Sequence, residues 1–143
     1  MSISTVAFLM TLASGLSSQS LAVGGVDLSM QMEDVVSAFG EPLRTESAMD
    51  WYDHVHIYED FSIHTVGGQD IVGIESDSEG VCLGDGVCVG DVWDEELLAD
   101  SGYEDCCDRV YPVFNYWKPD DNCRYLLAVE GSKVVKVAGF CSP

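Results

Sequence analysis

Two stretches of the chain, residues 28–40 and 90–102, follow the same pattern although they lie far apart. Each carries an acidic pair directly before an aliphatic pair, and each ends at a glycine, Gly40 or Gly102. Acidic side chains favour the first turn of a helix, and glycine favours the position just after its last turn. The pattern therefore predicts that the chain contains the same short helix twice.

Each predicted helix is followed by segments with the alternation of β-strands. In the first half, Ser29 is placed to cap a helix over residues 30–39, and Pro42 prevents its continuation. In the second half, Asp91 is placed to cap a helix over residues 92–101. The predicted strands cover residues 51–58, 61–66 and 70–76, then 110–117, 123–129 and 133–140, with turns at Gly67-Gly68 and Glu130-Gly131-Ser132.

These elements predict an α+β fold of two tandem units, residues 23–80 and 81–143, that form one globular domain. Each unit would combine a helix with a three-stranded antiparallel meander. A unit of this size buries little apolar surface, so we expect the meanders to join into one sheet with both helices packed on one face. Trp51, Val55 and Ile57 are expected beneath the helices, and the opposite face of the sheet is expected to be open.

Residues 1–22 have the composition of a secretory signal peptide. They contain no charged side chain, and the apolar run from Val6 to Leu12 is too short to span a bilayer. Ser20 and Ala22 match the small residues that precede a cleavage site. We expect a secreted or periplasmic protein with no membrane insertion after cleavage; a buried N-terminal strand or helix is the alternative.

The chain contains an even number of cysteines, and all of them lie in the second half: Cys82, Cys88, Cys106, Cys107, Cys123 and Cys141. After an export signal, this favours disulfide bonds over zinc, whose sites have closer C-x2-C spacing. We expect Cys82 to pair with Cys88 across a glycine-rich loop. Because neighbouring residues of an extended chain point to opposite faces, Cys106 and Cys107 are expected to pair with Cys123 and Cys141, in either order.

The net charge of −19 comes from 25 acidic and 6 basic residues. Such a chain lacks the basic surface that nucleic acids and anionic membranes require. Its acidic residues are dispersed among 47% apolar residues, so the chain is not a disordered acidic tail. The charge indicates either a solubilising surface or attraction to a cationic protein partner.

The helix segment from Leu28 to Pro42 and the strands from Trp51 to Ile74 resemble a helix-and-sheet unit, which residues 86–102 begin to repeat. The β-lactamase inhibitor proteins have two such units in tandem, and outer-membrane assembly lipoproteins of the BamE type have one. The resemblance implies protein binding through the open sheet face, as an enzyme inhibitor or as a cell-envelope scaffold or assembly factor. The chain differs from the lipoproteins in having two units and lacking their anchor cysteine. It differs from the inhibitor proteins in its cysteines, which all lie in the second unit.

Alternation along the predicted strands places aromatic and histidine side chains on the open face. Such side chains supply binding area at little cost in conformational entropy. The alternative is that they belong to the core, because strands are generally rich in aromatic residues. The predicted partner-binding residues are Tyr52, His54, His56, Tyr58, Tyr111, Tyr116 and Trp117.

Three histidines, His54, His56 and His64, give a second functional hypothesis, the binding of Zn²⁺ or Cu²⁺. His54 and His56 point to the same face of a strand. If Tyr58 pairs with Ser62, then His64 joins them; if Tyr58 pairs with Phe61, His64 points to the opposite face. No nucleophile elbow, phosphate loop or HExxH motif is present in the sequence, so enzymatic activity is not expected.

Overall fold

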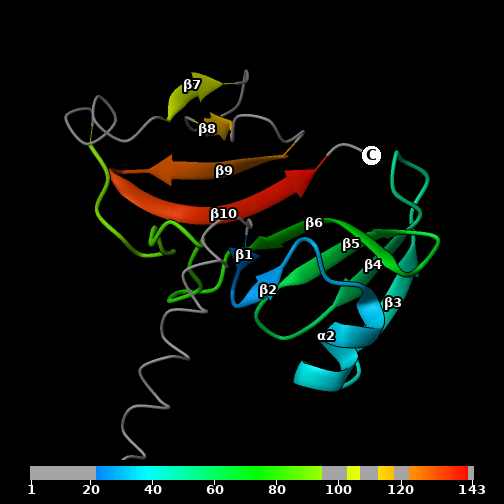
Figure 1. The fold of residues 1–143 in the computed structure, drawn as a ribbon. Helices are drawn as coiled ribbons and strands as arrows, with labels where there is room; N and C mark the ends of the chain where they lie inside the picture. The colour runs from blue at the N-terminus through cyan, green and yellow to red at the C-terminus, as the bar shows by residue number, and fades with distance from the viewer. Residues whose placement is uncertain (1–21, 95–102, 107–112, 118–122, 142–143) are drawn as a thin grey trace, which may run out of the picture.

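The computed structural model describes residues 22–94, 103–106, 113–117 and 123–141, with backbone only for 104–106 and 113–117. One antiparallel sheet of eight strands, in the order β3-β4-β5-β6-β10-β9-β8-β7, dominates this part of the chain (Figure 1). A small sheet of β1 and β2 and the helix α2 accompany it. The elements are β1 Ala22–Val23, β2 Val26–Asp27, α2 Met32–Phe39, β3 Arg44–Ser47, β4 His54–Ile57, β5 Ser62–Val66, β6 Asp70–Ser76, β7 Glu104–Cys106, β8 Val113–Trp117, β9 Cys123–Glu130 and β10 Lys133–Cys141.

The predicted α+β fold of two helix-plus-meander units is wrong. The described residues are mainly β-strand, and they contain one short helix, α2, of eight residues. The start of the predicted second helix is extended instead: Val92 forms a β-bridge with Lys133, and the Trp93 N–H donates to the Ser132 C=O at 2.8 Å. These bonds to the β9–β10 turn take the place of helical hydrogen bonds, while residues 95–101 lie outside the described part of the chain.

Helix α2 begins two residues later than expected and has a different cap. Ser29 instead donates its N–H and hydroxyl to the Asp27 carboxylate, at 2.8 and 2.7 Å. The N-cap is Gln31, whose N–H donates to the Asp34 carboxylate at 3.1 Å. The helix ends at Gly40, as expected, where φ is 87°, a conformation that favours glycine.

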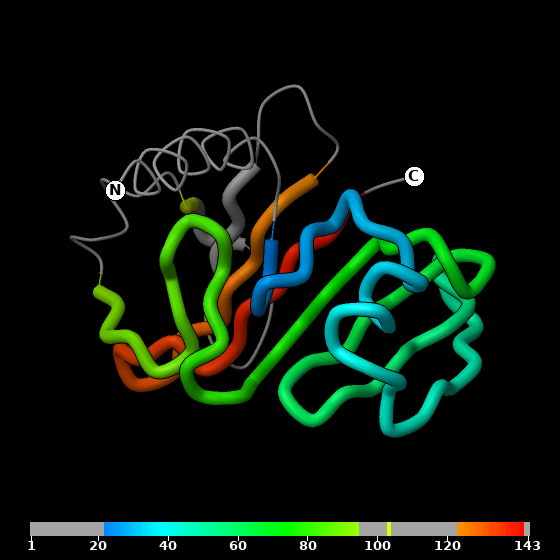
Figure 2. The backbone as a smooth tube through the Cα atoms, turned by 60° about the horizontal axis from the view of Figure 1, so that its bottom comes forward, coloured from blue at the N-terminus to red at the C-terminus, as the bar shows by residue number. Residues whose placement is uncertain are grey.

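The core lies between one face of the sheet and two elements that cover it, α2 and the N-terminal segment, residues 22–31. In Figure 2 the N-terminal segment (blue) crosses the junction between β6 (green) and β10 (red). At this junction Gly139 pairs with Ile74 and packs against Val23 and Leu28. Fully buried residues of this core include Val23, Val26, Val35, Ile63, Ile74, Leu127, Val134 and Val137.

The opposite face, here called the outer face, carries His64 and Phe140. Val55 pairs with His64 and therefore faces outward, whereas His56 pairs with the fully buried Ile63 and faces α2. The expectation that Val55 and Ile57 lie beneath the helix is therefore wrong. The cause is the β4–β5 turn, where the Tyr58 N–H donates to the Phe61 C=O at 2.9 Å and sets a register that exchanges the two faces.

Two disulfide bonds join described residues. Cys82 bonds to Cys88, which confirms that prediction. Cys123 bonds to Cys141, so the expected pairing of these two cysteines with Cys106 and Cys107 is wrong. The reason is strand register, because Cys123 and Cys141 lie directly opposite each other on β9 and β10, with Cα atoms 3.9 Å apart.

None of the helices in the described residues is long and apolar enough to cross a membrane.

Candidate protein-binding surface

The loop between β3 and β4, residues 48–53, exposes two large apolar side chains. Met49 is fully exposed, with a relative accessibility of 104%, and Trp51 is 46% exposed. Most large apolar side chains of the described residues are buried in the core. Exposed Met and Trp on one short loop are therefore a candidate contact surface for another protein.

Backbone hydrogen bonds hold the base of this loop. The Ala48 N–H donates to the Asp53 C=O, and the Asp53 N–H donates to the Thr65 C=O, both at 3.0 Å. The first bond closes the loop, and the second fixes it to β5. The loop therefore presents Met49 and Trp51 from a rigid base.

The Asp53 carboxylate adds a second anchor. Its two oxygens accept hydrogen bonds from the Gly67 N–H at 2.9 and 3.0 Å, and His54 Nδ1 lies 2.6 Å from Oδ1. The hydrogen bond from Gly67 is the main reason why the pKa of Asp53 is lowered, and His54 adds to the effect. The ionised carboxylate thus connects the loop to the β5–β6 turn.

An aromatic cluster on the outer face supports the loop from below. The Tyr52 ring lies 4.4 Å from the His64 ring, and the Trp51 ring lies 6.2 Å from the Phe140 ring, between centroids. Phe140 occupies the space over Gly73, where a Cβ atom would collide with its ring. The loop is therefore packed onto the centre of the sheet, where β6 meets β10.

His64 is the buried polar member of this cluster. Its side chain is 8% exposed, and Nδ1 has no hydrogen-bond partner among the described residues. Nε2 lies 3.9 Å from the Glu75 carboxylate, which also forms a 3.4 Å ion pair with Lys136. Burial is the largest cause of the lowered pKa of His64; Lys136 lowers the pKa further, while Glu75 and Asp50 raise it.

We expect the stability of the protein to decrease as the pH falls from about 7.5 to about 5, because buried His64 and His56 resist protonation. Their pKa values are lowered from 6.5 in the folded state. The unfolded chain therefore binds more protons in this range, and acid favours unfolding. Urea denaturation at several pH values should give a shallower dependence for His64→Phe, which keeps a ring but does not titrate.

Ile63→Val provides the control, since it changes the core without a titratable group and should lower stability to the same extent at every pH. An equal reduction of the slope in His64→Phe and Ile63→Val would contradict the role of histidine protonation.

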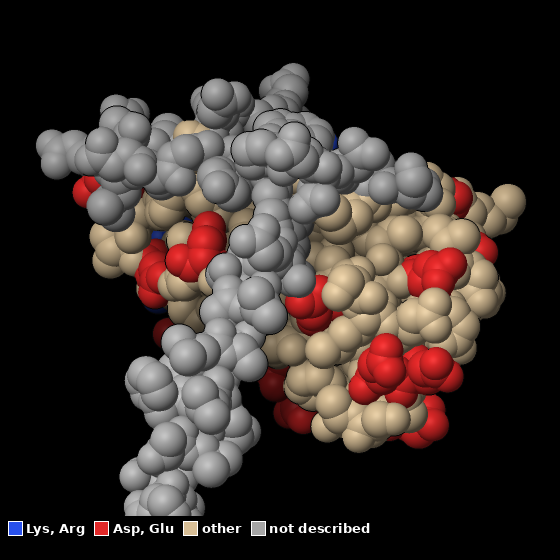
Figure 3. Space-filling model, viewed as in Figure 1, with Lys and Arg blue, Asp and Glu red and all other residues tan. Residues whose placement is uncertain are grey.

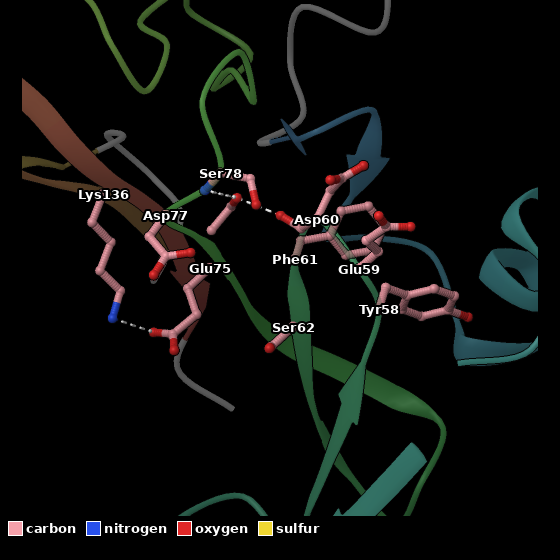
Figure 4. A pocket seen from close by; sticks show the side chains of 10 residues that line it. Tyr58, Glu59, Asp60, Phe61, Ser62, Glu75, Asp77, Ser78 and Lys136 are labelled. Carbon is pink, nitrogen blue, oxygen red and sulfur yellow. Dashed lines mark hydrogen bonds and ion pairs between the residues drawn. The ribbon is translucent and has the colours of Figure 1, made fainter. Parts of the chain in front are cut away.

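A polar cleft of about 220 Å³ lies beside the β4–β5 turn (Figure 4). In Figure 4, Glu75 and Lys136 point toward each other at one end of the cleft, joined by their ion pair. The Ser76 hydroxyl donates to the Asp60 C=O and holds the turn against β6. The cleft is thus a hydrophilic feature, lined by Tyr58, Glu59, Asp60, Phe61, Ser62, Glu75, Ser76, Asp77, Ser78 and Lys136.

The structure does not bring the predicted binding residues together on the outer face. Tyr52 lies there, but His54 and His56 are on the helix side of β4, as the register of β4 with β5 shows. His56 is buried, with Nδ1 3.2 Å from Thr45 Oγ1 and Nε2 2.8 Å from Thr65 Oγ1.

The remaining predicted binding residues are separated from this surface or not described. The Tyr58 hydroxyl donates to the Gly40 C=O at 2.8 Å, beside the end of α2. Tyr111 lies outside the described residues, and only the backbone of Tyr116 and Trp117 is described, in β8. The sequence interpretation missed Met49 and Trp51, although an apolar residue on each side of Asp50, between two strands, was a usable signal.

The three-histidine site is not formed in this register. His54 and His56 face α2, while His64 faces outward opposite Val55. In the described part of the chain, no group of three or more His, Cys, Asp or Glu side chains is arranged to hold a metal ion. A Zn²⁺ or Cu²⁺ cofactor stays a prediction.

No protein-family model and no curated protein sequence matches the chain. Among solved structures, a cysteine-rich secretory protein from Staphylococcus aureus is similar, with a TM-score of 0.57 and 13% sequence identity. The match covers 80% of this chain and 44% of that chain, so this chain spans less than half the length of its structural neighbour. At this identity the likeness concerns the fold alone, and the resemblance to the inhibitor proteins and BamE-type lipoproteins stays a prediction.

The disulfide bonds bear on localisation. Bonds such as Cys82–Cys88 and Cys123–Cys141 form and persist in oxidising compartments and are rare in the cytosol. They are consistent with an extracellular or otherwise exported protein.

Proposed function

We propose that the chain is a secreted protein that binds another protein through the β3–β4 loop surface, formed by Met49, Trp51 and Tyr52. The observation that carries the proposal is the exposure of Met49 and Trp51 on a loop with a fixed base. The structural neighbour is a secretory protein, which agrees with export.

The chemistry of these side chains supports a binding role. Tryptophan and tyrosine bury large areas at low cost in conformational entropy, and methionine adapts to irregular surfaces. Asp53 and the aromatic cluster already order the loop, so little ordering remains to be done when a partner binds. Loss of either anchor is expected to weaken binding without removing a contact residue.

The charge of the chain supports a cationic partner. Acidic side chains are distributed over the face shown in Figure 3, where very little blue is visible. Asp50 lies between Met49 and Trp51, and Glu46 lies on the adjacent strand. A partner with a basic rim around an apolar pocket would match the loop surface and would be attracted at long range.

A more specific form of this function is inhibition of a secreted enzyme. A projecting loop with apolar side chains can enter an active-site cleft and exclude substrate. The proposal requires only that the loop contact the partner. Inhibition would follow if the loop binds at the active site of the partner.

The test is capture of partner proteins from culture medium by immobilised protein, followed by titration of the captured protein. Met49→Ser with Trp51→Ser should weaken binding at least about thirtyfold, because loss of even one anchor residue of this type costs about 2 kcal/mol or more. Val92→Ser provides the matched control, since Val92 is also an exposed apolar side chain, at 72%, but lies on another segment.

Thermal unfolding of both variants should resemble that of the unmodified protein. Equal affinity of the loop variant and the Val92→Ser variant would contradict the proposal. A partner that requires the loop but binds equally well at high salt would support the surface and refute the cationic partner.

A further inference from the structure

β3 lies at one end of the sheet order, and among the described residues it pairs on one side only, with β4. All four of its residues, Arg44–Ser47, are exposed. Unprotected edge strands present unpaired N–H and C=O groups to which another strand can be added. β3 therefore offers a short template for strand pairing.

The hydrogen-bond pattern identifies which backbone groups face outward. In an antiparallel pair, alternate residues direct both N–H and C=O toward the neighbouring strand. The bond from the Ala48 N–H to the Asp53 C=O places Ala48 among the residues that face β4, together with Glu46 and Arg44 in the same register. Thr45 and Ser47 consequently direct their backbone groups toward the free edge.

We propose that β3 pairs antiparallel with β3 of a second copy of this chain, about a two-fold axis at Thr45. Thr45 would exchange backbone hydrogen bonds with Thr45 of the second copy. The two sheets would then join into one continuous sheet across the dimer.

Charge complementarity selects a second copy as the occupant. With the axis at Thr45, Arg44 lies opposite Glu46 of the second copy, and this contact occurs twice. Arg44 and Glu46 already form an exposed ion pair within β3, at 2.7 Å, so the dimer would join two such pairs into a ladder of alternating charges. Arg44 is one of only 6 basic residues in the whole sequence, and it lies on this edge.

The alternative axis at Glu46 is disfavoured for two reasons. It would place Glu46 against Glu46 of the second copy, with repulsion between like charges. It would also bring together residues whose backbone groups face β4 rather than the free edge. Both charge and hydrogen bonding therefore favour the axis at Thr45 over the axis at Glu46.

Two properties of such a dimer follow. The contact is a four-residue strand, so the interface is small and the association is weak and depends on concentration. Each copy also carries a net charge of −19, so repulsion between the copies opposes association at low salt. Because salt screens charges beyond about 10 Å at 0.1 M, association should strengthen as salt is added.

The test is sedimentation velocity of the full chain over a range of protein and salt concentrations. The unmodified protein should form a dimer that strengthens with salt. Arg44→Glu should raise the dimer dissociation constant at least about tenfold, because it replaces two attractive contacts with two repulsive ones. Lys133→Glu makes the same change of net charge at an exposed position outside β3, and it should have a much smaller effect.

Charge exchange provides the decisive experiment. Arg44→Glu combined with Glu46→Arg should restore dimerisation. The single variants Arg44→Glu and Glu46→Arg should each be monomeric alone but should associate with each other when mixed, since every contact between them is then complementary. These results would show which residues face each other, independently of partner binding by the β3–β4 loop.

A chain that stays monomeric at high protein and salt concentration would overturn the proposal. Failure of the mixed variants to associate, with both folded by thermal unfolding, would do the same. A dimer that persists in Arg44→Glu would show that another surface is responsible.

Discussion

Ile74→Ala should lower the free energy of unfolding by about 3–4 kcal/mol, because it leaves a cavity in a fully buried part of the core. Ile74 is fully buried on β6, opposite Ile63 on one side and Gly139 on the other. A loss of this size is a large fraction of the stability of a typical domain, which is about 5–15 kcal/mol. Urea denaturation followed by fluorescence would measure it.

Val92→Ala removes methyl groups from a side chain that is 72% exposed and serves as the control. It should change the free energy of unfolding by less than about 0.5 kcal/mol. Comparable losses in the two variants would mean that Ile74 is not a core residue, and the placement of the sheet junction would then be wrong.

Replacing both Cys123 and Cys141 with serine should cost about 3 kcal/mol, mainly because the unfolded chain gains conformational freedom. The bond spans 18 residues, whereas Cys82–Cys88 spans 6, for which the same reasoning gives about 2 kcal/mol. Removal of Cys123–Cys141 should have the larger effect also because both residues pack against the core cluster. Chemical denaturation of the two double variants would establish the order.

The opposite order, with a larger loss for Cys82→Ser with Cys88→Ser, would show that the glycine-rich loop depends on its bond more than β9 and β10 depend on theirs. Single serine variants are unsuitable, because each leaves an unpaired thiol that can exchange with other disulfides.

Local signals predicted the local elements of the first half. The end of α2 at Gly40 and the strand at residues 70–76 follow from the residues themselves, and the turn at Gly67-Gly68 has the positive φ values, 68° and 77°, that glycine permits. The turn at residues 130–132 between β9 and β10 is found for the same reason. Such signals depend on a few neighbouring residues and need no tertiary context.

The start of the second predicted helix was wrong because tertiary hydrogen bonds hold it extended. The similarity between residues 28–40 and 90–102 is real in sequence, but the Val134 N–H donates to the Asp91 C=O at 2.8 Å and the Trp93 N–H donates to the Ser132 C=O, so the described residues 91–93 are extended. Hydrogen bonds between residues so far apart in sequence cannot be predicted from the local pattern of acidic and aliphatic residues. The overall fold is therefore mainly β.

The candidate binding surface was predicted only in part, because a one-residue difference in register exchanges the faces of a strand. Tyr52 was placed correctly on the outer face, but only because residues 51–53 belong to a loop and not to β4. His56 is in the strand and was placed on the wrong side. Exposure of Met49 and Trp51 depends on where β4 begins, at His54, which alternation does not define.

The junction between β6 and β10 has a consequence for how the protein forms. β3 to β6 are connected by short turns and can assemble as soon as they leave the ribosome, whereas β6 acquires its second neighbour from residues 137–140 of β10, the last strand of the sheet in sequence order. Until those residues emerge, Ile74 and the rest of that edge are exposed to solvent and to other chains. If synthesis or export stalls before β10, the sheet of β3 to β6 keeps an unpaired edge at β6 that can pair with other chains. Pairing of β10 with β6 is therefore the step that protects the protein from aggregation.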